Sequence, residues 1–292
     1  MPNGIAVPNI RPRVHQHILT ARQAGFSGMF FLQLTIKALS AGAIVLALSL
    51  LAERVKPRVA GVIAGAPLGA LISFYMLGLE EGPGFVIASV PHAVAGMSGV
   101  LVFVALYHAV SLRVVRFNAV KSACAGLIGY LAVAFTLEAT PLTIITALPV
   151  TVTVAIIVGF LFRRTEDIRI VKPVRLTLKL LFVRAGSAAF IVVSAVAIAQ
   201  ALGPRVAGVL VGFPLTLLPT MLIVHLTYSR DHVHAMLQGF PVGLGSVICY
   251  LITLPWSFST LGVHLGTLVS LAAALCYLAL LSLVFGWIRR RR

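Results

Sequence analysis

Long apolar stretches follow one another along most of the chain, and short polar or basic segments separate them. Each stretch holds about 20 residues or more, the length that an α-helix needs to cross the hydrocarbon core of a bilayer. The stretches lack strict alternation of apolar and polar positions, which favours helices over the strands of a membrane barrel. The pattern predicts an all-α polytopic membrane protein of about nine transmembrane helices. The predicted spans are residues 29–53, 59–79, 84–110, 118–137, 141–162, 180–202, 205–227, 234–256 and 260–288.

The composition agrees with this prediction. Of the 292 residues, 60% are apolar and 10% are charged, which is too little polar surface to cover a soluble globule. A net charge of +16 would suggest nucleic acid as the partner of a soluble protein, but here the basic residues gather at the ends of predicted spans. The sequence therefore predicts the lipid bilayer as a partner, no nucleic acid, and no soluble domain.

The distribution of lysine and arginine predicts which end of the chain lies in the cytoplasm. An odd number of spans places the two termini on opposite sides, and cytoplasmic loops are the ones enriched in Lys and Arg. Most of the 23 basic side chains, including those of residues 163–179 and 289–292, fall on one side of the predicted membrane. This bias places the C-terminus in the cytoplasm, although the arginines of the N-terminal tail count against it.

The chain contains an internal repeat. KPRVAGVIAGAPLGAL at residues 56–71 matches GPRVAGVLVGFPLTLL at 203–218, and the match extends upstream without a gap. An odd number of predicted spans separates equivalent positions, so the second copy is expected to cross the membrane in the opposite direction. Such inverted repeats are frequent in secondary transporters, where the substrate binds near the midplane between the copies. The predicted organisation is an N-terminal tail at 1–28, a first repeat of five helices at 29–162, a basic cytoplasmic linker at 163–179, a second repeat of four helices at 180–288 and a basic tail at 289–292.

Glycine and proline interrupt the same predicted span in both copies, at Gly65 and Pro67 and again at Gly212 and Pro214. Proline removes a helical hydrogen bond and glycine weakens the turn, so both spans are expected to be kinked or broken near mid-membrane. Backbone groups freed there, together with the hydroxyl of Thr216, are candidates for binding a ligand. The alternative is that these residues only kink the helices for packing.

A cation occupies equivalent positions in the two copies, Lys37 in the first predicted span and Arg184 in the sixth. A charge within a span is costly and usually faces the protein interior or a water-filled path. The shared sign of the two charges predicts an anion-binding site, to which we also assign the aligned hydroxyls of Ser40 and Ser187. The alternative is that each cation snorkels to the nearby membrane surface.

Histidines within or beside the spans are the remaining candidates for chemistry. His225 is the best candidate for a protonatable group, whereas interhelical hydrogen bonds account for other imidazoles in the spans, such as His108. His232 and His234 have a spacing seen in some metal sites, but no cluster of Cys, Asp or Glu completes a ligand set. The sequence therefore predicts no bound metal and no cofactor.

No Asp or Glu lies clearly inside a predicted span. Proton-driven carriers often use a carboxylate inside the membrane, so coupling through such a group is disfavoured. Sodium coupling, exchange and passive flow stay open. Neither paired carboxylates nor a nucleophile with a neighbouring base stand out, which argues against an enzyme.

At the core of the repeat, a lysine in an apolar helix is followed by Pro-Arg-Val-Ala-Gly and then by Gly-Phe-Pro-Leu-Thr. In this order of motifs each half resembles the small GlpM-like bacterial inner-membrane proteins, which have a single such unit per chain. The likeness is best over residues 182–256, and the first half departs from it at Ala66 and Gly69, where the second has Phe213 and Thr216. The resemblance implies a bacterial inner-membrane location and a duplicated unit. It implies no substrate, because the family lacks an established biochemical activity.

Together, these features predict a secondary transporter or permeation protein that moves a small anion or anionic metabolite by alternating access. Two alternatives stay open. One is a non-transporting accessory or scaffold subunit of an envelope system, and the other is a transporter of lipid or lipid-linked phosphate. The sequence leaves oligomer formation open as well.

Overall fold

The computed structural model describes residues 57–114, 116–162, 203–211, 213–214 and 217–290, together with Thr35, Leu39, Ala43, Ala47 and Gly186. Every regular element in this part of the chain is an α-helix, which confirms the all-α prediction for it. The predicted spans 29–53 and 180–202, the linker 163–179 and the N-terminal tail lie outside the described residues, apart from those isolated positions.

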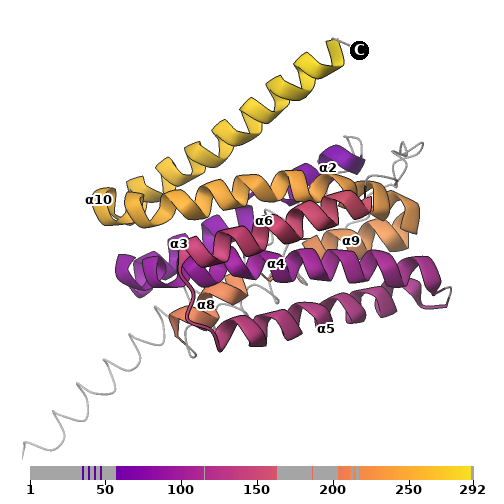
Figure 1. Ribbon diagram of the computed structural model, residues 1–292, viewed down its shortest axis with the longest axis horizontal. Helices are drawn as coiled ribbons and strands as arrows, with labels where there is room; N and C mark the ends of the chain where they lie inside the picture. The colour runs from indigo at the N-terminus through magenta and orange to yellow at the C-terminus, as the bar shows by residue number, and fades with distance from the viewer. Residues whose placement is uncertain are drawn as a thin grey trace, which may run out of the picture.

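The helices follow the predicted spans closely, with two interruptions. The spans predicted at 84–110, 118–137 and 141–162 each form one helix, whereas those at 59–79 and 205–227 are each divided in two. The helices, labelled as in Figure 1, are α2 (Pro57–Ala64), α3 (Leu68–Glu80), α4 (Pro83–Arg113), α5 (Asn118–Glu138), α6 (Ile144–Leu161), α8 (Pro204–Val211), α9 (Leu217–Thr227) and α10 (Arg230–Arg290).

The element α10 is a helical hairpin of two arms. Gly262 has φ 72° and ψ −176°, a conformation that glycine adopts without strain, and the chain reverses there. The second arm packs back on the first, because the hydroxyls of Ser257 and Ser270 lie 2.8 Å apart and Tyr277 donates a hydrogen bond of 3.3 Å to the carbonyl of Val242. The predicted spans 234–256 and 260–288 are these two arms, with the reversal slightly later in the chain than predicted.

Proline and glycine place several helix ends. Pro57, Pro83 and Pro204 open α2, α4 and α8, at a position where the missing N–H breaks no helical hydrogen bond. Gly82 has φ 86° and makes the tight turn from α3 into α4. Because α3 and α4 also contact each other after this short turn, they run antiparallel.

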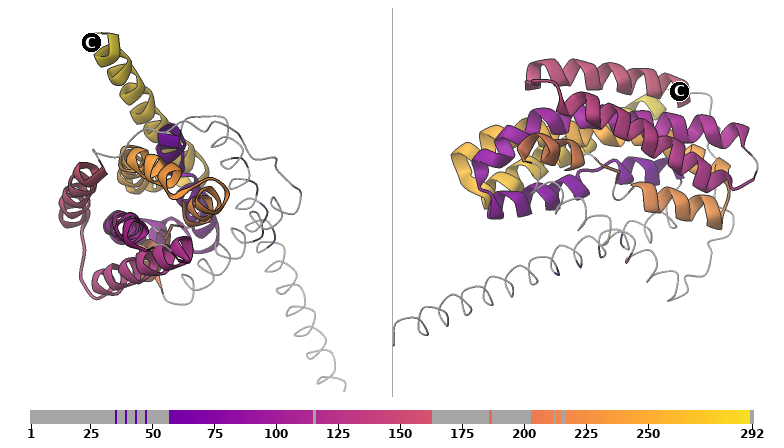
Figure 2. Two further views of the ribbon diagram at one scale, coloured as in Figure 1. Left: turned by 90° about the vertical axis from the view of Figure 1, so that its right-hand side faces the viewer. Right: turned by 90° about the horizontal axis from the view of Figure 1, so that it is seen from below.

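The long helix α4 lies at the centre of the bundle and contacts α3, α5, α6, α8 and the first arm of α10. Much of its length is buried, including the aromatic side chains of Phe103 and Tyr107. Gly126 of α5 lets the ring and carbonyl of Phe103 approach closely, since a Cβ at this position would lie 2.6 Å from the ring. The end-on view in Figure 2 shows α5 and α6 at the periphery of the bundle.

Apolar side chains face outward on α5, α6 and the second arm of α10. Phe135, Ile145 and Leu283 are exposed over 74%, 84% and 68% of their surface. An apolar exterior of this extent would be costly in water and is favourable in lipid. Five helices of the described part are long and apolar enough to cross a membrane. These features are compatible with a multi-pass membrane protein.

The divided helix α2–α3 lies along the first arm of α10 and runs in the same direction. The residue numbers of the contacts increase along both segments. Gly61 contacts the backbone at Met236, Gly65 contacts Gly243, and Gly78 contacts the ring of Phe258. At Gly61 and Gly65 the contacts are between backbones, so any side chain there would force the helices apart.

Of the second divided helix, α8 lies along α4, and α9 reaches α4 through the contact of His225 with Tyr107. Here Gly208 meets the backbone at Ser89, Val209 meets Gly96, and His225 meets Tyr107. Gly208 is the residue that the repeat aligns with Gly61. Each divided helix therefore packs on the long helix that follows the other divided helix in the chain. Because α3 is antiparallel to α4, the two divided helices run in opposite directions, and so do α4 and the first arm of α10 (Figure 1).

Candidate functional site

The first helix break lies between α2 and α3, at Gly65-Ala66-Pro67. Pro67 has no N–H, so the helical ladder cannot pass through it. The N–H of Ala66 instead donates to the carbonyl of Ile63 at 3.0 Å, and the N–H of Leu71 donates to the carbonyl of Pro67 at 2.7 Å. Gly65 and Pro67 are both buried, so the break lies inside the protein.

The second break, between α8 and α9, has the same backbone hydrogen bonds at the equivalent residues. The N–H of Phe213 donates to the carbonyl of Leu210 at 2.9 Å, and the N–H of Leu218 donates to the carbonyl of Pro214 at 2.9 Å. Pro214 is buried like Pro67. The structure thus confirms the interruption that the two prolines predict, and it shows one turn geometry at both places.

Each break exposes backbone groups of opposite polarity. The carbonyls in the last turn of a helix have no helical hydrogen-bond partners, and these carry partial negative charge. The N–H groups in the first turn of the next helix also have no helical partners, and these carry partial positive charge. At the start of α3, the N–H of Leu68 donates to the carbonyl of Ala66 at 2.8 Å, and no side chain of the described residues caps the first turn. The positive end of a helix dipole favours an anion, so the start of α3 is suited to one.

Tyr130 of α5 supports the second break. Its hydroxyl donates a hydrogen bond of 2.6 Å to the carbonyl of Val209, and its ring meets that of Phe213 edge to face at 5.1 Å. Val209 needs this partner, because the N–H of Phe213 has turned to Leu210. Tyr130 is fully buried, so the hydrogen bond is shielded from solvent. Nothing in the sequence singled out Tyr130, since a single tyrosine in an apolar helix carries no signal of its partner.

The other residues of the predicted site lie outside the described part of the chain. These are Lys37, Ser40, Arg184, Ser187, Gly212 and Thr216. Of the predicted set, Gly65, Pro67 and Pro214 are described, and all three belong to the breaks. The contact between α3 and α8 brings the two divided helices together in the bundle.

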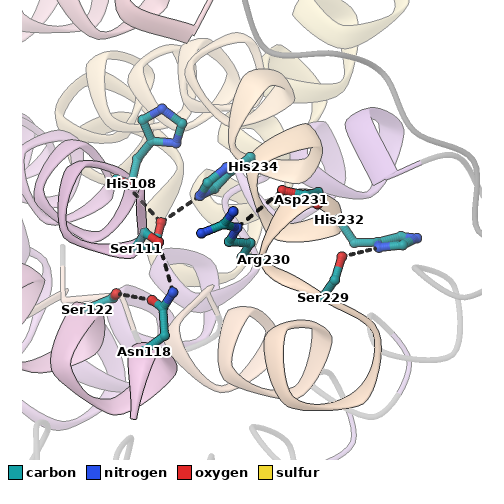
Figure 3. A network of polar contacts seen from close by, with 9 residues as sticks. All are labelled: His108, Ser111, Asn118, Ser122, Ser229, Arg230, Asp231, His232 and His234. Carbon is teal, nitrogen blue, oxygen red and sulfur yellow. Dashed lines mark hydrogen bonds and ion pairs between the residues drawn. The ribbon is translucent and has the colours of Figure 1, made fainter. Parts of the chain in front are cut away.

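A second polar region lies where α4 ends and α10 begins (Figure 3). His108 of α4 and His234 of α10 are buried, and their ring centroids lie 4.3 Å apart with an interplanar angle of 68°. The hydroxyl of Ser111 lies 2.5 Å from Nε2 of His234 and 2.8 Å from the carbonyl of His108. Nδ1 of His108 is buried and has no hydrogen-bond partner among the described residues.

Neighbouring helices extend this network. The hydroxyl of Tyr107 lies 2.7 Å from Nδ1 of His225 on α9, and Nδ2 of Asn118 donates to the carbonyl of Ser111 at 2.8 Å. Ser122 of α5 in turn donates to Asn118 at 3.0 Å. The structure therefore places His225, predicted as the best protonatable group, close to His108 and His234.

The histidines do not complete a metal site in the described part of the chain. No group of three or more His, Cys, Asp or Glu side chains with the geometry to hold a metal ion is present there. His232, the partner of His234 in the sequence motif, instead lies 2.8 Å from the hydroxyl of Ser229 through its Nδ1. Figure 3 shows His232 pointing away from the His108–His234 pair.

Comparisons of the chain with protein-family models, curated proteins and solved structures found no match. The resemblance of each half to GlpM-like proteins therefore rests on the sequence motifs alone and stays a prediction. The paired helix breaks and the histidine network are the two features of the described residues from which a function can be proposed.

Proposed function

We propose that the chain is a secondary transporter or permeation protein for a small anion or anionic metabolite, working by alternating access in the bacterial inner membrane with its C-terminus in the cytoplasm. The observation that carries the proposal is the pair of helix breaks at Pro67 and Pro214. They share one backbone geometry, and each lies in a helix packed on the long helix of the other copy. Broken helices at a repeat interface are where transporters of this architecture bind their substrates.

The same geometry supports an inverted repeat. In a two-fold arrangement, each contact that a residue of one unit makes with the other unit is repeated by the equivalent residue of that other unit. The alignment that pairs Pro91 with Pro241 makes Ser89 equivalent to Gly239. Gly61 lies against Gly239 as Gly208 lies against Ser89, and the equivalent helices run in opposite directions. We propose nine spans in all, with the first and sixth at 29–53 and 180–202.

The proposed substrate is an anion because of the helix start at α3 and the two cations of the repeat. The first turn of α3, which no side chain of the described residues caps, supplies partial positive charge beside the buried Pro67. In an inverted repeat, Lys37 and Arg184 would approach the midplane from opposite faces of the membrane. Such a pair suits a site that opens alternately to each side.

Alternating access requires the two copies to move against each other, and their contact surface is suited to this. At Gly61 and Gly208 the contact is made by backbone, without interlocking side chains. Smooth surfaces of this kind allow helices to slide or rock with little repacking. We propose that the two divided helices move in this way relative to α4 and the first arm of α10.

The proposal is tested by flux in proteoliposomes that contain the purified full-length protein. Vesicles are offered a panel of radiolabelled anions, namely phosphate, sulfate, small carboxylates and sugar phosphates, with protein-free vesicles as the control. The proposal expects uptake or exchange of at least one of them. Absence of flux for the whole panel, with stable co-purification of another envelope protein, would favour an accessory subunit. Acyl-chain lipid retained through purification, again without flux, would favour a lipid carrier.

A further inference from the structure

Three histidines from three helices gather at the end of the bundle where α4 finishes and α10 starts. His108 and His234 are in ring contact, and His225 lies beside them through Tyr107. Two of the three, His108 and His234, are buried, and burial of an imidazole costs free energy unless its ring nitrogens are hydrogen-bonded. Figure 3 shows His108 and His234 converging above Ser111.

The hydrogen bonds of the pair leave room for one more proton. The single hydroxyl proton of Ser111 can be donated either to the carbonyl of His108 or to Nε2 of His234. When it goes to the carbonyl, Nε2 of His234 donates to the Ser111 oxygen. Nδ1 of His108 has no partner among the described residues in either case. A buried polar atom without a partner costs about 1–3 kcal/mol.

Among the residues that the structure describes, no acidic side chain lies where it could balance this proton. Of the four described acidic residues, Glu80, Glu81 and Glu138 lie at the other ends of their helices, where α3 meets α4 and where α5 finishes. Asp231, near His234 in the chain, lies 3.6 Å from Arg230, and both side chains are about half exposed. This ion pair carries no net charge.

The other described elements that pack around the pair add neutral groups or rings. Phe162, which follows α6, meets His108 edge to face at 4.8 Å. Asn118 of α5 binds the carbonyl of Ser111, and α4 contributes Tyr107. His225 of α9 is the remaining titratable group, and its Nδ1 is engaged with the Tyr107 hydroxyl.

We propose that His108 and His234 form a proton-binding site that takes one proton per pair, and that this proton is carried together with the transported anion. The proton adds to an imidazole nitrogen from water on one side of the membrane and returns to water on the other, so no other bond is made or broken. This inference rests on the proposed transport function and names its coupling ion.

Two physical arguments set the stoichiometry. Two imidazoles in contact repel when both are charged, so the first proton opposes the second and the pair titrates as a unit. A single proton on the buried pair is then a positive charge in a medium of low dielectric, with no carboxylate of the described residues beside it. A mobile anion is the counter-charge that makes protonation favourable. The proton and the anion therefore stabilise each other, which is symport by linkage.

The position of the cluster allows this coupling. His225 follows the second break on the same helix, eight residues after the first residue of α9, or about 12 Å along the helix axis. A movement of α9 relative to α4 would change the Tyr107–His225 contact and the access of the His108–His234 pair to water. The histidine network is thus connected to α9, one of the helices that the proposed transport cycle moves.

The proton site is tested on the wild-type full-length protein, labelled with ¹⁵N-histidine, in detergent micelles. Imidazole signals are followed during a pH titration, with and without phosphate, sulfate or acetate. We expect the pair to take up one proton in a coupled step, and at least one anion to extend protonation to higher pH. Two independent protons, or no proton in the accessible range, would overturn the proposal. No substitution is needed, so loss of folding cannot obscure the result.

Coupling is tested in proteoliposomes that enclose a pH-sensitive dye. An inward gradient of whichever anion shows flux should acidify the interior. His108→Gln and His234→Gln should lower proton entry per anion by at least about tenfold, because an amide does not take up a proton near neutral pH. His264→Gln is the matched control, since His264 lies at an exposed position against Tyr75. Anion flux without proton entry in the wild type would refute the coupling but not the transport function. Absence of all flux would refute both the transport function and the coupling.

Discussion

Replacing Lys37 and Arg184 together by glutamine is expected to abolish anion flux through the reconstituted protein. Both cations lie within predicted spans at equivalent positions of the repeat. A hydrogen bond from a charged group contributes about 1.5–3 kcal/mol, so the loss of two should weaken anion binding by at least about a hundredfold. Flux of the labelled anion in proteoliposomes measures the effect.

The matched control for this double substitution is Lys121→Gln, which removes a positive charge from an exposed position on α5. It should transport like the wild type. Thermal unfolding of each variant in detergent checks that the fold is retained. Wild-type flux in the folded double variant would show that Lys37 and Arg184 only snorkel to the membrane surface, and the predicted anion site would then be wrong.

Leucine at Gly61 or at Gly208 is expected to destabilise the protein strongly and to a similar degree. A side chain at Gly61 would run into the carbonyl of Met236, and one at Gly208 would run into the carbonyl of Ser89. Overpacking usually costs about 1–3 kcal/mol, and values at the upper end or beyond are expected here because helix backbones cannot yield as side chains do. The midpoint of thermal unfolding in detergent, followed by circular dichroism, measures the loss.

Gly159→Leu is the control for this pair. Gly159 also lies in a membrane helix, α6, but an added Cβ there would meet no atom within 4 Å. The variant should unfold at the wild-type temperature. Equal tolerance of leucine at Gly208 and Gly159 would mean that the close packing of α8 on α4, and with it the reciprocal contact of the two copies, is incorrect.

The helices and their breaks could be predicted because their causes are local. Length and apolarity fix which stretches cross a bilayer, and the missing N–H of Pro67 and Pro214 interrupts a helix whatever surrounds it. The alignment of the two copies pointed to the equivalent turns, which the structure shows with the same hydrogen bonds. The end of the first arm of α10 was predicted a few residues early, at a run that contains Ser259 and Thr260. These residues stay in the helix, because their hydroxyls donate to the carbonyl of Trp256, and the chain reverses only at Gly262.

The partners of the polar side chains could not be predicted, because packing between distant segments decides them. His108, His225 and His234 come from three helices, and only the placement of α9 and α10 against α4 brings them together. The hydrogen bond from Tyr130 to the Val209 carbonyl likewise joins helices that are distant in the sequence. Sequence reasoning assigned His108 to ordinary interhelical hydrogen bonding, whereas its Nδ1 is buried without a partner among the described residues.

The central claim, that two copies of one unit face opposite ways across the membrane, is tested most directly by thiol accessibility at Arg58 and Arg205. These equivalent residues follow the prolines that open α2 and α8, and Arg205 is exposed. Each is replaced by cysteine in a background in which Cys124, Cys249 and Cys276 are serine. An impermeant maleimide added to intact cells should label Arg205→Cys, and should label Arg58→Cys only after the membrane is opened. Labelling of both positions from the same side would contradict the inverted repeat and the transport mechanism built on it.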